Sequence, residues 1–338
     1  MTWHMPMAMS FWLTLLEHAP GTRGEDSGTQ CRGSNRLAEA RVPGTSPTGR
    51  QRELGVRLRE LRNGRGLTVE GVAKELLCSA TKISRLETGA RRPSLRDVRD
   101  LCELYDVGEE TSSELMSLAR GAREQGWWTQ YDDLNLDPYI GLEQEATAIT
   151  CYSMYYIPGL LQTEDYARGI IETVAPKMDP QIVEQRVEAR LRRQQVLEDD
   201  SRPRYHVLID EAVIRRGVGG RPLMVAQLDK ILATVHSDRA IVQVIPFVVG
   251  AYAAANGYFV LLEFEEDSNL WPIVYIEGLT DNQYLQRSAD ISRYRETIEY
   301  LQYRALSPRE STEFMALARE RYATELLLSG VPLHRLIK

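Results

Sequence analysis

Residues Thr68 to Pro93 read TVEGVAKELLCSATKISRLETGARRP and show the clearest structural pattern in the chain. Thr68 and Ser79 stand where N-cap residues precede two short helices, and Gly89 stands where a left-handed C-cap ends the second one. The apolar side chains recur where two helices joined by a tight turn would touch, at Val72, Ala73, Leu76, Cys78, Ile83 and Leu86. The stretch therefore predicts a helix-turn-helix.

The turn of this motif has one unusual residue. In the common helix-turn-helix pattern, Val69 takes the first position, Ala73 the position where the helices cross, and Leu77 the turn position that usually holds glycine. A leucine in the left-handed conformation costs about 1 kcal/mol. We therefore expect a turn one residue looser than the commonest form.

The second helix of the pair leaves a polar and basic face open. Lys82 and Arg85 can donate hydrogen bonds to guanine in a major groove, and Thr81 and Ser84 can reach bases or phosphates. Two arginines just beyond the helix are better placed for phosphates. The candidate DNA-binding residues are Thr68, Ser79, Thr81, Lys82, Ser84, Arg85, Arg91 and Arg92.

A helix-turn-helix can also serve packing or protein contact alone. Glu87 suits that structural role, because it can cap the helix or pair with Arg85 or Arg91. The segment Glu53–Asn63, however, predicts a preceding amphipathic helix with several arginines on its polar side, which packing alone does not require. We therefore expect double-stranded DNA to be the partner of this part of the chain.

The helices around this motif predict a compact all-helical domain over residues 50–108. Its charge differs from that of the remaining chain. Residues 50–107 contain 13 Lys and Arg against 9 Asp and Glu, whereas residues 108–338 contain 24 against 35. The overall net charge of -7 thus comes from the back of the chain, and a positive balance remains where DNA contact is expected.

The run KISRLETGARRPS, residues 82–94, resembles the xenobiotic-response-element (XRE) family of bacterial helix-turn-helix regulators. The resemblance covers Leu54 to Val107 and implies a lambda-repressor-like fold. Members of that family often have glutamines at the starts of the second and third helices, where this chain has Val69 and Ala80. The resemblance therefore implies no adenine contact from those two places, and the expected base readers are Thr81, Lys82 and Arg85.

Residues 109–330 predict a mixed α+β domain with a small sheet. Strand patterns rich in Val, Ile, Tyr or Phe occur at residues 205–209, 240–246, 258–265 and 273–277. Residues 140–200 have mostly helical patterns, and further helices are expected at 112–125, 222–235, 285–305 and 308–328. The fold class is therefore an all-α domain followed by an α+β domain.

This back part resembles a domain of unknown function that follows the helix-turn-helix in many actinomycete regulators and is often described as antitoxin-like. The segments that resemble it are Trp127-Trp128, YIPGLLQTEDYAR (156–168), RQQVL (193–197), IDEAVIRR (209–216), Gly219-Gly220, Gln227-Leu228 and VQVIPF (242–247). The resemblance implies a transcription factor tied to development or specialised metabolism, often encoded beside a small partner protein.

No catalytic, cofactor or metal site is expected in the back domain. The best charged cluster, Asp210, Glu211 and Arg215, matches an ordinary helix start with acids near the positive end of the dipole. The four cysteines have neither a paired spacing nor nearby paired histidines, which fits a reducing cytoplasm and excludes the usual zinc patterns. Four aromatic residues either line a ligand pocket or, as aromatics at helix ends more often do, belong to the core: Trp127, Trp128, Tyr155 and Tyr156.

The arginines of residues 180–197 are expected on a solvated helix face, with partner contact as the alternative. Residues 1–49 are expected to be disordered because they cannot bury enough apolar surface. An alternative is that translation starts at Val42, so that residues 1–41 are not in the natural product. No run of apolar residues is long enough to span a membrane.

These patterns together predict a cytoplasmic, homodimeric, sequence-specific regulator of transcription that binds a two-fold DNA site. Its C-terminal domain would sense a ligand or bind a small protein partner encoded nearby. The alternative is an antitoxin-like interaction module that sequesters the small partner and regulates its own synthesis by DNA binding.

Overall fold

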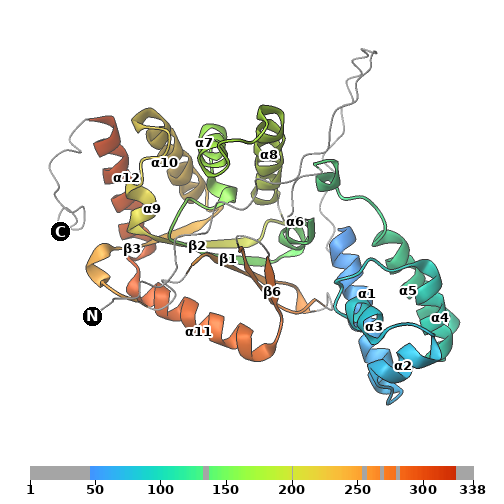
Figure 1. Cartoon of the computed structure of the whole chain (residues 1–338). Helices are drawn as coiled ribbons and strands as arrows, with labels where there is room; N and C mark the ends of the chain where they lie inside the picture. Colours follow the sequence, from blue (N-terminus) through green and yellow to red (C-terminus); the bar gives the residue numbers. More distant parts are fainter. Residues whose placement is uncertain are drawn as a thin grey trace, which may run out of the picture.

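The computed structural model describes residues 46–131, 137–199, 201–252, 257–266, 270–278 and 282–324. A helical N-terminal domain is followed by a mixed α+β domain, as the sequence predicted (Figure 1). The described part contains no helix with both the length and the apolar character needed to cross a membrane.

In the described residues, five helices build the N-terminal domain. They are α1 (Pro47–Gly64), α2 (Val69–Glu75), α3 (Ala80–Glu87), α4 (Leu95–Leu104) and α5 (Glu109–Gly121). Leu115 and Ala119 of α5 are fully buried in the same apolar cluster as Leu54 of α1. The helical core therefore continues beyond the boundary expected at residue 108.

Helix α1 starts earlier than the sequence predicted. The expected leader ended at residue 49, but residues 47–49 form the first turn of α1. The Ser46 hydroxyl accepts a hydrogen bond from the Gly49 N–H at 2.9 Å, and the Ser46 N–H donates to the Glu145 carboxylate at 2.6 Å. This cap and this tertiary contact order the turn. Residues 1–45, including Val42, lie outside the described residues.

The C-terminal domain follows a short η1 turn (Trp127–Gln130). Its strands are β1 (Ala148–Ser153), β2 (Arg204–Asp210), β3 (Ile241–Ile245), β4 (Phe259–Glu263), β5 (Ile273–Ile276) and β6 (Gln283–Leu285). Its α-helices are α6 (Asp137–Glu145), α7 (Glu164–Val174), α8 (Pro180–Arg193), α9 (Glu211–Arg215), α10 (Arg221–His236), α11 (Ser288–Arg304) and α12 (Pro308–Ala323). The described part of the domain also contains the short 3₁₀ turns η2 (Gly159–Leu161), η3 (Gln194–Leu197) and η4 (Phe247–Val249).

The six strands that the structure describes form one mixed sheet in the order β3-β2-β1-β4-β5-β6. Strands β1, β2 and β3 run parallel to one another, and β4, β5 and β6 continue the sheet in antiparallel pairs. Helices α7, α10 and α12 cover one face, and α11 covers the other (Figure 1). Neighbouring residues of β1 pack on opposite faces of the sheet. Cys151 belongs to the apolar cluster under α7, α10 and α12, and Tyr152 belongs to the cluster under α11.

Two strands were missed in the sequence. Residues 140–200 were expected to be mostly helical, but Ala148–Ser153 forms the inner strand β1. This strand is buried on both faces, so it lacks the polar alternation that marks a half-buried strand. Strand β6 has three residues, and its last residue was assigned to the helix that follows. The sheet is therefore larger than expected.

Candidate nucleic-acid interface

The two helices of the motif begin at the predicted caps. The Thr68 hydroxyl accepts a hydrogen bond from the Gly71 N–H at 3.0 Å, and the Ser79 hydroxyl accepts one from the Lys82 N–H at 3.2 Å. Each hydroxyl satisfies a donor in the first turn that the helix itself leaves without a partner. Thr68 and Ser79 remain exposed, so both cap residues lie at the surface beside the helix N-termini.

The expected loosening of the turn is wrong. Leu77 itself adopts the left-handed conformation, with φ +49°, and its side chain is 95% exposed. The Cys78 N–H bonds to the Ala73 carbonyl at 2.9 Å, and the Leu77 N–H bonds to the Lys74 carbonyl at 3.3 Å. This is the hydrogen-bond pattern of a Schellman motif, which ends α2 without an additional residue. The backbone bonds and helix packing therefore outweigh the strain of a leucine there.

Helix α3 ends in the same way, at the predicted glycine. Gly89 has φ +66°, and the Ala90 N–H bonds to the Arg85 carbonyl at 2.9 Å. A Cβ on Gly89 would also meet the Cγ of Arg52 at 2.7 Å. The end of α3 is thus held close against α1, and the left-handed cap confirms the role predicted for Gly89.

The outer face of α3 is polar and open. Thr81, Ser84 and Arg85 are exposed on it, and Arg91 and Arg92 are exposed in the segment that follows. Within the described residues, none of these three arginines forms an ion pair. Their charges are therefore available to an external anion such as a DNA phosphate.

Lys82 differs from the other candidates. Its ammonium group lies 2.6 Å from the Asp97 carboxylate of α4, and both side chains are largely covered. The pair joins α3 to α4 in the free protein. A base contact from Lys82 would have to break this pair, whereas Arg85 is already free to bind.

Glu87 has a different partner from those predicted. Instead of Arg85 or Arg91, it accepts hydrogen bonds from the Arg62 guanidinium of α1 at 2.6 and 3.0 Å. Arg59 lies 3.7 Å from the same carboxylate. The hydrogen bond to Glu87 raises the pKa of Arg62 above its ordinary value. Glu87 thus anchors α3 to the first helix and leaves Arg85 and Arg91 free, which the local sequence could not show.

The charged cluster of Asp210, Glu211 and Arg215 stabilises the fold of the C-terminal domain. Asp210 caps α9, as predicted, by accepting the Ala212 N–H at 2.7 Å. Glu211 is fully buried, pairs with Arg215 at 2.5 Å and accepts the Phe247 N–H at 2.8 Å. Both carboxylates are therefore occupied by contacts inside the domain.

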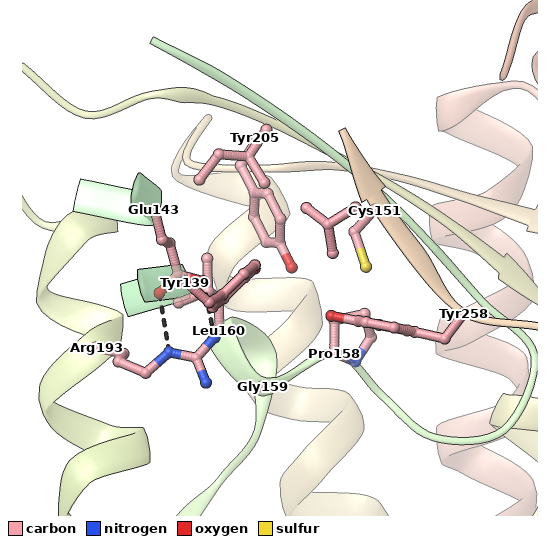
Figure 2. Close-up of a pocket in the computed structure, with 11 residues that line it drawn as sticks. Tyr139, Glu143, Cys151, Pro158, Gly159, Leu160, Arg193, Tyr205 and Tyr258 are labelled. Carbon is pink, nitrogen blue, oxygen red and sulfur yellow. Dashed lines mark hydrogen bonds and ion pairs between the residues drawn. The ribbon is translucent and has the colours of Figure 1, made fainter. Parts of the chain in front are cut away.

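The expectation of a solvated arginine face on α8 is wrong for Arg190 and Arg193. The Arg193 guanidinium makes two hydrogen bonds to the buried Glu143 carboxylate, at 2.9 and 2.8 Å (Figure 2). Arg190 donates to the Gln162 side chain at 2.9 Å, and burial lowers the pKa of Arg190 to about 10. Helix α8 lies against α7 and η2, so these arginines face the domain interior.

Figure 2 shows the small pocket beside this ion pair, where Tyr205, Tyr258 and Cys151 meet. Its volume is about 10 Å³, which is room for about one water molecule. Burial raises the pKa of the Cys151 thiol to about 12, so the thiol stays protonated at neutral pH. This pocket is a polar part of the core and is too small for an organic ligand.

The paired tryptophans lie at the junction of the two domains. Trp128 is 4% exposed, and the Trp127 ring packs edge-on against it and beneath the Arg192 guanidinium, 4.5 Å away. These contacts place Trp128 in the core, as the commoner of the two interpretations predicted.

Among the described residues, no group of three or more His, Cys, Asp or Glu is arranged to hold a metal.

Two family models match the chain. A helix-turn-helix domain matches residues 53–115, which covers α2, α3 and the candidate DNA-binding residues. A domain of unknown function (DUF5753) matches residues 136–316, which covers the sheet and most of its helices. No curated protein and no solved structure matched the chain in the comparisons made. Because the second match covers more than half of the chain, the protein belongs to the DUF5753 family and carries a helix-turn-helix domain in front of it.

Proposed function

We propose that the protein is a sequence-specific transcription regulator of the XRE type that inserts α3 into the major groove of DNA. The observation that carries this proposal is the open face of α3. Thr81, Ser84 and Arg85 are exposed together there, and Arg85 has no ion-pair partner among the described residues. A guanidinium in this position can bind guanine with two hydrogen bonds.

The proposed XRE type is supported by the structural roles of residues in the run 82–94. Glu87 anchors α3 to α1, Gly89 takes the left-handed C-cap, and Pro93 is buried ahead of α4. Each of these residues shapes the backbone around α3, and the exposed residues between them are left for DNA. The link to actinomycete regulators rests on the segments of the back domain that resemble theirs.

We further propose a homodimer on a two-fold operator, with the C-terminal domain receiving a ligand or a small partner protein. A change at that domain would alter the spacing of the two helical domains, on which operator affinity depends. The contacts of Ser46 with α6 support this coupling, because they tie the start of α1 directly to the C-terminal domain.

Selection of DNA from a random duplex library tests the main proposal. The full-length protein is expected to enrich one palindromic or near-palindromic sequence, and sedimentation should show two protein chains on it. Enrichment of no sequence, with retention governed only by salt concentration, would contradict the proposal.

The antitoxin-like function is the second candidate. Phe247 and Val248 of η4 are 53% and 67% exposed and adjacent, which is the kind of apolar surface that a protein partner covers. Purification of the wild type and of Phe247→Glu from the native host distinguishes the two functions. A small protein that copurifies stoichiometrically with the wild type but not with the variant would favour the antitoxin-like function. If no small protein copurifies with the wild type, the regulator function alone is favoured.

We propose no catalytic activity for the back domain. This is supported by the contacts of Asp210 and Glu211 inside the fold and by the protonated state of Cys151. Hydrolysis or group transfer that copurifies with the chain and is lost in a Glu211→Gln variant would contradict this part of the proposal.

A further inference from the structure

A cavity of about 510 Å³ lies between the helical domain and the sheet domain. One wall is formed by α1 and the end of α3, and the other by the segment before β5 and the segment from β6 to the start of α11. Its volume is within the range of about 300–1,000 Å³ found for small-molecule sites. The cavity is separate from the open face of α3 and from the small pocket of Figure 2.

Arg52 of α1 is the most unusual group in this cavity. The residue is 8% exposed, and its Nε and Nη1 are buried without a hydrogen-bond partner among the described residues. Its guanidinium lies 5.5 Å from the centre of the Tyr284 ring, and no carboxylate of the described residues pairs with it. Burial lowers the pKa of Arg52 to about 10, so it is still charged at neutral pH. A buried cation without an anion is costly, and a bound anion would remove that cost.

The other lining residues define what such an anion would carry. Trp271 is 60% exposed and lines the cavity, and Tyr284 lies under the Arg52 guanidinium. Arg59 and Arg287 also line it, but Arg59 lies 3.7 Å from the Glu87 carboxylate, and Arg287 pairs with Asp290 at 2.7 Å. The cavity thus combines aromatic surface with one buried cation, Arg52, which no carboxylate of the described residues neutralises.

We propose that this cavity binds a small organic anion, a carboxylate or phosphate on a flat apolar ring, with Arg52 holding the anionic group and Trp271 packing on the ring. This proposal adds a ligand site to the proposed regulator. Binding of the anion does not depend on the regulator function, but its effect on DNA binding rests on that function. Glu87 and Thr88 of the cavity wall end the DNA-reading helix, so a ligand would fix α3 relative to the sheet domain.

The test uses the full chain and simple probes: benzoate and phenyl phosphate as anions, and neutral benzamide as the matched control. Calorimetry and thermal unfolding are expected to show binding of at least one anion and none of benzamide. Arg52→Met keeps the apolar stem of the side chain and removes its charge, and it should weaken anion binding about ten-fold or more. Arg309→Met, at a side chain 89% exposed on α12, should bind like the wild type.

Trp271→Ala provides a second variant in case substitution of the buried Arg52 disturbs folding. The Trp271 side chain is mostly exposed, so its removal should leave the fold intact. This substitution should also weaken anion binding while circular dichroism stays unchanged. The absence of binding by both anions, equal binding of benzamide, or wild-type affinity in Arg52→Met and Trp271→Ala would overturn the proposal.

Measurements of operator binding with and without the anion test the ligand site and the regulator function separately. For the wild type, the bound anion is expected to change affinity for the selected operator about five-fold or more, and Arg52→Met should remove that change. Anion binding without any operator would refute the regulator and leave the site intact. Operator binding without Arg52-dependent anion binding would refute only the site.

Discussion

The Arg62 guanidinium of α1 donates two hydrogen bonds, at 2.6 and 3.0 Å, to Glu87, the last residue of α3. The two side chains are 11% and 4% exposed, so the pair is shielded from water. Gly55 brings the two helices close together nearby, because a Cβ there would lie 2.7 Å from the Leu86 carbonyl oxygen. Helix α3, the proposed DNA-reading helix, is therefore positioned from behind by α1.

Glu87→Ala is expected to destabilise the protein by about 3 kcal/mol, because it leaves the buried Arg62 charge without its partner. Urea unfolding followed by circular dichroism measures this free energy. Glu75→Ala on α2, at an exposed side chain, is the control and should change stability by less than about 0.5 kcal/mol. Equal effects of the two substitutions would show that the pair does not anchor α3.

Leu77 carries the strain of the turn, with φ +49° and an exposed side chain. Leu77→Gly is expected to be about 1 kcal/mol more stable than Leu77→Ala, since both remove the same exposed side chain and only glycine relieves the left-handed backbone. Thermal or urea unfolding of the two variants measures the difference. Identical stabilities would mean that the turn is not strained.

His206 predicts a dependence of stability on pH. Its Nε2–H donates to Gln243 at 2.8 Å, and its Nδ1 accepts from Gln302 at 3.0 Å, so the folded protein holds the neutral ring. Burial lowers the pKa of His206, and the unfolded chain therefore binds the proton more readily. The contribution of His206 to the free energy of unfolding is present above the unfolded pKa of about 6.5 and falls as the pH drops below it.

Urea unfolding at about pH 7.5 and about pH 5.5 measures this effect. The wild type should lose stability between the two, and His206→Asn should lose less. The same loss in both proteins would assign the pH dependence to other groups.

Lys82 and Arg85 are expected to contribute unequally to DNA affinity. Lys82 must leave Asp97 to reach DNA, so Lys82→Ala should reduce operator affinity less than Arg85→Ala does. Asp97→Asn frees the ammonium group and should strengthen DNA binding at low salt. Fluorescence anisotropy at several salt concentrations measures both effects, and a larger loss from Lys82→Ala would contradict this ranking.

The parts of the fold that could be predicted depend on local chemistry. Thr68, Ser79 and Gly89 mark their helix ends through hydrogen bonds to residues only a few positions away, and all three were predicted correctly. The strands β2 to β5 were also found, because each is a short apolar run between polar segments. Strand β1 was missed because its sequence AITCYS has few of the Val, Ile, Tyr and Phe residues that mark the other strands, although it is buried to a similar extent.

The partners of the site residues could not be predicted, because they lie far apart in the sequence. Asp97 is 15 residues from Lys82, and Arg62 is 25 residues from Glu87. The junction cavity depends on an even longer contact, between Arg52 of one domain and Tyr284 of the other. Only the folded chain brings these groups together.

The open face of α3 is proposed to read DNA, and Arg85→Ala tests this assignment most directly. Binding to the selected operator should weaken by about 1–3 kcal/mol, and discrimination against one base pair should be lost. Arg309→Ala makes the same charge change on α12, and its operator affinity should stay within about two-fold of the wild type. Wild-type affinity and an unchanged base preference for Arg85→Ala would contradict the assignment of α3 as the reading helix.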